Sequence, residues 1–235
     1  MRSSNLAKID YGFARLLTVC HSFRMGASGA TRIRPFPPLA QMEKGDELLA
    51  GNATVEERLA GFERSRERCS KLFDGAKLTD DEWDSIRTQP VFVQYLSVPH
   101  TFSAAKNFDS PEVIAAVSTI VAGPMFGALD YLLFSRLDYT ELANAYGNER
   151  GAPLMALTVQ AVLCRMGDDC GPGGTVTEHI CWQFGICGNR VEDAILANLH
   201  HRGLDTAAFN QFVFRVHQAL QTGNTSIFRK QVPAK

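Results

Sequence analysis

The amino-acid sequence predicts an all-α fold, a compact domain of about eight helices. Apolar residues recur at helical spacing in one segment after another, and cap or break residues separate these segments by short loops. Neither a β-hairpin signal nor an alternation of strands with helices accompanies them. The 235 residues are 45% hydrophobic and 21% charged, which is typical of a globular protein with a sizeable core.

The first helix is expected to begin at Thr54, because Thr54 and Glu57 have the spacing of a capping box. Its apolar face is expected to contain Val55, Leu59, Phe62, Cys69 and Phe73. Cys69 is interpreted as a buried thiol on that face. The charged residues between them, including Arg64 and Arg68, are expected to form a solvated face.

A short helix is expected next, because Thr79 and Glu82 repeat the capping-box spacing. Residues 91–96 are rich in β-branched and aromatic residues, which is typical of a strand. A single strand has no partner in this chain, so the segment is interpreted as a buried helical turn after Pro90.

Two apolar helices are expected in the middle of the chain. Ser110, followed by a proline, is expected to cap a helix that ends at Gly123, and a second apolar segment covers 125–134. Together, 113–134 have the length of a membrane span. Asp130 and the glycine and proline breakers inside the segment favour two buried helices instead, so no transmembrane span is predicted.

Asp138 is expected to start a short helix that ends near Gly147. Pro153 is expected to open the next helix, which runs to Cys164. This helix is apolar on almost every side. A helix without a polar face normally lies at the centre of its domain, so we place this one in the core.

Three helices complete the chain. Thr175 and Glu178 again have capping-box spacing, Asn189 is expected to start a helix that stops at Gly203, and Asp205 is expected to cap the last helix. The packed face of the last helix is expected to contain Phe209, Phe212, Val213, Val216 and Leu220.

The predicted organisation is a basic leader or flexible segment (1–40), a linker (41–53), one helical domain (54–222) and a flexible tail (223–235). The first segment contains six basic residues and one acidic residue, about +5, whereas the whole chain is −1, so no nucleic-acid partner is predicted. Its basic start and short apolar run favour export to the periplasm or secretion. A lipid anchor at Cys20 and a cytoplasmic protein with a basic tail are the alternatives.

Four of the six cysteines form two similar motifs, Cys164-x5-Cys170 and Cys181-x5-Cys187, each followed by glycine. Two disulfides that staple the C-terminal helical layer are the first explanation. A structural zinc site of the same four thiolates is the second. The third is a catalytic thiol, but His179 and Cys181 point about 200° apart on a helix, so a distant histidine would be needed.

The other histidines and acidic residues give no catalytic pattern. His200 and His201 diverge by about 100° on a helix, so they cannot both face one ion. Asp168, Asp169 and Glu178 flank the cysteines and are expected to cap helix ends or face solvent. No catalytic residue is therefore assigned.

The Cys and Gly spacing, followed by two amphipathic helices, resembles the C-terminal region of poorly characterised helical proteins exported by proteobacteria, over about residues 150–222. The resemblance implies disulfide-bonded cysteines and no established catalytic residues. We therefore expect an exported, non-enzymatic protein without a cofactor that binds another protein in an immunity, adaptor or envelope role. The alternative is a secreted effector or hydrolase with a zinc or thiol site between Cys164 and Cys187.

Overall fold

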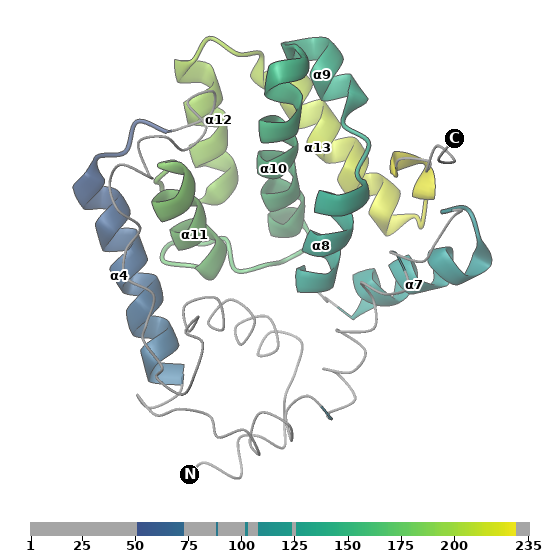
Figure 1. Cartoon of the computed structure of the whole chain (residues 1–235), viewed down its shortest axis with the longest axis horizontal. Coiled ribbons are helices and arrows are strands. Elements are labelled where there is room, and N and C mark those ends of the chain that lie inside the picture. The colour runs from purple at the N-terminus through teal and green to yellow at the C-terminus, as the bar shows by residue number, and fades with distance from the viewer. Residues whose placement is uncertain (1–50, 73–87, 89–101, 103–107, 124–125, 229–235) are drawn as a thin grey trace, which may run out of the picture. The chain divides into compact units, whose positions relative to one another are not determined.

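The computed structural model describes residues 51–72, 88, 102, 108–123 and 126–228 (Figure 1). These residues form eight α-helices and one 3-10 helix: α4 (Val55–Leu72), α7 (Pro111–Ala122), α8 (Phe126–Arg136), α9 (Thr140–Tyr146), α10 (Asn148–Arg165), α11 (Thr175–Phe184), α12 (Val191–His201), α13 (Thr206–Gln221) and η2 (Thr225–Ile227). The predicted all-α fold is confirmed. The expected leader, the helix from Thr79 and the turn at 91–96 lie outside the described residues.

The chain forms two compact units. The described part of the first unit contains α4, α11, the loops beside α11, and α12 up to Ala194. The second unit contains α7, α8, α9, α10, α13 and η2, together with α12 from Ile195.

Helix α10 is central in the second unit, as its apolar composition predicts. It packs against α8, α9 and α13. Leu154, Leu157 and every residue of 158–163 are buried. The predicted start at Pro153 is wrong, because α10 begins five residues earlier, directly after α9. Gly147 makes this sharp junction with a φ of +90°, and its carbonyl accepts hydrogen bonds from the first turn of α10.

Helices α7 and α8 are separate helices that contact each other. The Ser110 hydroxyl accepts a hydrogen bond from the Val113 amide at 3.4 Å, which confirms the predicted cap. The carboxylate of Asp130 on α8 accepts a hydrogen bond from the side-chain Nε2 of Gln160 on α10 at 3.3 Å, so this acidic residue has a polar partner on the central helix. No helix in the described part of the chain has both the length and the apolar character needed to cross a membrane.

The predicted end of α12 and start of α13 are also confirmed. Gly203 has a φ of +68°, and the Leu204 amide bonds back to the Leu199 carbonyl, as in a left-handed C-cap. Asp205 Oδ1 then accepts hydrogen bonds from the amides of Ala207 and Ala208, at 2.8 and 3.3 Å. The buried face of α13 includes all the predicted residues, Phe209, Phe212, Val213, Val216 and Leu220.

Residues 223–228, assigned above to the tail, pack onto the second unit. The Thr225 hydroxyl donates to the Asp109 carboxylate at 3.0 Å. Phe228 is only 3% exposed, and its ring centroid lies 5.4 Å from that of Phe108. A backbone bridge between Leu137 and Phe228 joins this end to the residue after α8. Aromatic packing and one buried hydroxyl therefore extend the ordered chain beyond α13.

Substitution of the α13 cap tests its contribution to stability. Asp205→Ala leaves two helix-terminal amides without their acceptor, so we expect the free energy of unfolding to fall by about 1 kcal/mol in a urea titration. Asp205→Asn is the matched control, because asparagine caps a helix about as well as aspartate. Equal losses in the two variants would contradict a capping role.

The ionisation of Tyr146 is expected to lower the free energy of unfolding at high pH. Its hydroxyl donates to the Asp205 carbonyl, and burial raises the pKa of Tyr146 above its ordinary value of 10.0. The unfolded chain therefore loses this proton first, and stability decreases as pH rises above about 10. Urea titrations between about pH 8 and pH 11 should show a steeper decline for the natural chain than for Tyr146→Phe, by at most about 1.4 kcal/mol per pH unit. Parallel declines would refute this.

Candidate functional site at the junction of α4 and α11

The cysteine cluster is oxidised. Cys181 in the last turn of α11 is bonded to Cys187 in the loop that follows. Cys164 and Cys170 are also disulfide-bonded, and the part of the chain that the structure describes contains no free cysteine. Disulfides are therefore present in the C-terminal region, as the first of the three explanations requires.

Cys69 corrects one prediction. It is buried on α4, as expected, with 8% of its surface exposed. It is also disulfide-bonded, so its interpretation as a free buried thiol is wrong. The helical pattern places the side chain on a face, but a disulfide requires a second sulfur close in space, which the local sequence does not reveal.

The contact face of α4 differs from the predicted apolar face. Phe62 is buried as expected, but Val55 and Leu59 are 39% and 40% exposed, and Phe73 lies outside the described residues. Gly61 marks the close approach to α11. A Cβ atom at Gly61 would lie 3.1 Å from a carboxylate oxygen of Glu178 and 3.3 Å from the sulfur of Cys181. Helix α4 therefore packs through a glycine and neighbouring arginines as well as through apolar side chains.

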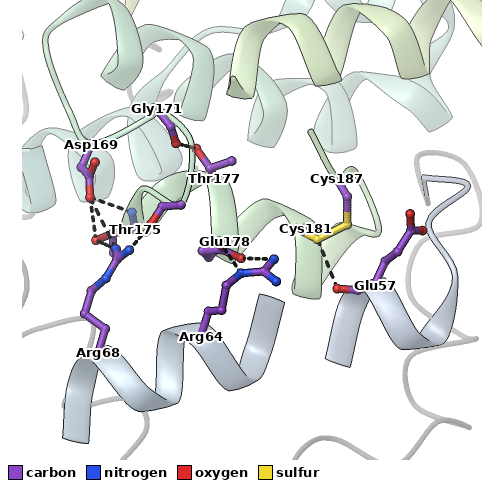
Figure 2. Close-up of polar contacts among 11 residues, drawn as sticks. Glu57, Arg64, Arg68, Asp169, Gly171, Thr175, Thr177, Glu178, Cys181 and Cys187 are labelled. Carbon is purple, nitrogen blue, oxygen red and sulfur yellow. Dashed lines mark hydrogen bonds and ion pairs between the residues drawn. A yellow bond between two sulfur atoms is a disulfide. The ribbon is translucent and has the colours of Figure 1, made fainter. Parts of the chain in front are cut away.

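Arg64 and Glu178 form the central contact of this helix pair (Figure 2). Nε and Nη2 of Arg64 donate to the two carboxylate oxygens of Glu178 at 2.7 and 2.8 Å. Glu178 is 4% exposed, whereas the Arg64 side chain is 54% exposed. The hydrogen bond that Arg64 donates to Glu178 raises the pKa of the Arg64 guanidinium. A bidentate bond of this kind compensates the buried carboxylate for lost water.

The predicted capping box of α11 is wrong, and so is the expectation that Glu178 is a cap or solvent-facing. Thr175 is the first residue of the helix, after Gly174 at the cap position. The amide and hydroxyl of Thr175 instead donate to the Asp169 carboxylate at 2.8 and 3.1 Å. Asp169 thus caps α11, as predicted for this residue, and its charge is favourable near a helix N-terminus.

Arg68 joins α4 to this N-terminal end of α11. It donates to the Thr175 hydroxyl at 2.8 Å, lies 3.5 Å from the Asp169 carboxylate and also bonds to the Gly173 carbonyl. Arg64 and Arg68 therefore contact α11, so the expectation of a wholly solvated charged face on α4 is wrong for these two residues.

Arg58 contacts the opposite end of α11, which shows that the two helices are antiparallel. Its guanidinium donates to the carbonyls of Trp182 and Gln183 at 3.1 and 3.0 Å. A cation at a helix C-terminus interacts favourably with the helix dipole. Burial lowers the pKa of Arg58. Three arginines of α4 thus bind the beginning, middle and end of α11.

The third explanation for the cysteines, a catalytic thiol, requires a histidine other than His179. In the structure the His179 ring packs edge-on against Trp182, with 5.3 Å between the ring centroids. While their disulfide is intact, Cys181 and Cys187 have no thiolate to offer a substrate or a zinc ion. Among the residues that the structure describes, no group of three or more His, Cys, Asp or Glu side chains is arranged to hold a metal.

One sequence signal could have indicated the arginine contacts. Arg58, Arg64 and Arg68 lie within about 120° of one another around a helix. Pairing them with Glu178 and Asp169 still requires tertiary structure, because more than a hundred residues separate the partners.

Removal of the central guanidinium is expected to destabilise the first unit. Arg64→Ala leaves the buried Glu178 carboxylate without its partner, and we expect the free energy of unfolding to fall by about 2 kcal/mol, less than for a fully buried pair because Arg64 is half exposed. Arg66→Ala is the control, because the ion pair of Arg66 among the described residues is with exposed Glu63 on the same helix. Urea titration of both variants measures the difference, and equal losses would contradict a special role for Arg64.

Comparisons with known protein families, with curated protein sequences and with solved structures found no match to this chain. Its function is therefore inferred from its own residues.

Proposed function

We propose that this chain is an exported protein, periplasmic or secreted, that acts by binding another protein. The observation that carries the proposal is the oxidised state of the cysteines. Cys181 is bonded to Cys187, and Cys69, Cys164 and Cys170 are also in disulfides. Disulfides persist in oxidising compartments and are rare where thiols are kept reduced. The basic N-terminal segment and the resemblance to exported helical proteins of proteobacteria support the same location.

The use of the charged residues beside the cysteines supports binding rather than catalysis. Arg58, Arg64 and Arg68 bind groups of α11 and its N-terminal loop, and Asp169 caps that helix. These contacts hold α4 and α11 together, as expected for charged residues that have a structural role.

Exposed aromatic side chains give the second unit a surface suited to protein contact. Tyr131 and Phe134 lie three residues apart on α8, and each is 43% exposed. Residues at this spacing share one side of a helix, and aromatic side chains are enriched in protein interfaces. An immunity, adaptor or envelope role would use such a contact.

The compartment is tested by the state of the thiols. Chain isolated from its native cells without a reductant and treated with an alkylating reagent should carry no label at Cys181 or Cys187 until it is reduced. Peptide mass spectrometry locates the label, and elemental analysis measures zinc in the same sample. Free thiols at Cys164, Cys170, Cys181 and Cys187 would overturn the proposal. Stoichiometric zinc would favour the alternative, an effector or hydrolase with a metal or thiol site.

Binding is tested by crosslinking the intact chain in its own compartment. We expect a discrete adduct with one other polypeptide that disappears when Tyr131 and Phe134 are both replaced by alanine, because the apolar contact is lost. Ser135→Ala is the matched control on the same helix and should retain the adduct. An adduct that is equally abundant in the natural chain and both variants would contradict binding through α8.

A further inference from the structure

The Cys181–Cys187 disulfide closes a short loop at the C-terminal end of α11. The bonded residues are six apart in sequence, with Cα atoms 4.2 Å apart. Gly185 lies inside the loop with a φ of +68°, and its amide donates to the Cys181 carbonyl at 3.0 Å. The carbonyls of 182–185 therefore all belong to the ring that the disulfide closes.

These four carbonyls accept hydrogen bonds from one segment, Gly51–Arg58, which we call the N-terminal strap. The Gly51 amide donates to the Phe184 carbonyl at 2.7 Å, and the Ala53 amide donates to the Gly185 carbonyl at 3.1 Å. The Arg58 guanidinium donates to the remaining two carbonyls, those of Trp182 and Gln183. These four acceptors all lie between the two bonded cysteines.

The strap also fits closely against the loop. A Cβ atom at Gly51 would lie only 1.9 Å from the Gly185 carbonyl oxygen, so this approach requires glycine. The Glu57 carbonyl oxygen lies 3.7 Å from the Cys181 sulfur (Figure 2). A disulfide sulfur carries no proton, so this is a packing contact. The capping box fixes the strap's direction, since the Thr54 amide donates to the Glu57 carboxylate at 2.7 Å.

We propose that the Cys181–Cys187 disulfide is a redox latch that controls docking of the N-terminal strap on the end of α11. Oxidation holds the four carbonyls in the arrangement that the strap binds. Reduction opens the ring, and the carbonyls lose that fixed arrangement, so the strap is released. By linkage, a docked strap must stabilise the disulfide by the same factor that the disulfide stabilises docking.

A dithiol of the thioredoxin type is the class of reductant that would open the latch. One of its thiolates attacks the sulfur of Cys187, because Cys187 is the less buried of the two residues. The protein disulfide breaks, and Cys181 leaves as a thiolate that takes up a proton. A mixed disulfide between Cys187 and the reductant remains. The second thiolate of the reductant attacks the reductant's own sulfur in that bond and releases Cys187 as a thiolate, which also takes up a proton. The dithiol thus becomes a disulfide, and its two electrons reduce the protein disulfide.

Hydrogen exchange in the full chain tests docking. In the Cys181→Ala/Cys187→Ala variant the amides of Gly51 and Ala53 should exchange roughly tenfold faster than in the oxidised natural chain, because their acceptors are no longer held. The amides of α13 should exchange at unchanged rates and thereby report that the second unit remains folded. Unchanged exchange at Gly51 and Ala53 would overturn the proposal.

The reciprocal experiment measures the disulfide itself and does not need the cysteine variant to fold. Arg58→Ala should lower the ratio of reduced to oxidised dithiothreitol at which half of Cys181–Cys187 is reduced, by roughly tenfold. Peptide-level alkylation separates this bond from the other disulfides. Arg66→Ala, on the same helix, should leave the ratio unchanged. An unchanged ratio in Arg58→Ala, or an equal shift in both variants, would overturn the coupling.

Discussion

The buried carboxylate of Glu178 is the constraint on which the described part of the first unit depends. A charge removed from water needs a partner of opposite charge with good geometry, and the guanidinium of Arg64 supplies both hydrogen bonds. This pair sets the register of α4 along α11. With the register set, Gly61 allows the helices to approach, Arg58 lies at one end of α11, and Arg68 lies at the other.

The second unit depends on apolar packing instead. Helix α10 presents buried residues toward α8, α9 and α13, and its buried polar side chains are satisfied. The Thr158 hydroxyl, for example, donates to the Leu154 carbonyl at 2.9 Å. The two units are therefore stabilised by different kinds of interaction. Oriented ionic contacts stabilise the first unit, and a close-packed apolar core stabilises the second.

The proposed location and the proposed redox latch both depend on the Cys181–Cys187 disulfide. An oxidising compartment keeps the Cys181–Cys187 ring closed and the N-terminal strap docked. Arrival in a reducing environment, or contact with a dithiol enzyme, would then change the conformation at the junction of α4 and α11.

Features whose interacting groups lie within a few residues of one another follow from the sequence alone. The Thr54 and Glu57 box, the caps at Ser110 and Asp205, the turn at Gly203 and the buried face of α13 all appear as predicted, because helix ends and faces follow from local hydrogen bonding and helical periodicity.

Contacts between distant segments depend on the tertiary structure. Arg64 and Glu178 are 114 residues apart, and Glu178 has the same local spacing from Thr175 as a capping-box residue. The disulfide bond of Cys69 and the exposure of Val55 and Leu59 also depend on which distant segments lie beside α4. A side chain's partner depends on which helix lies beside it, and neither periodicity nor spacing along one helix contains that information.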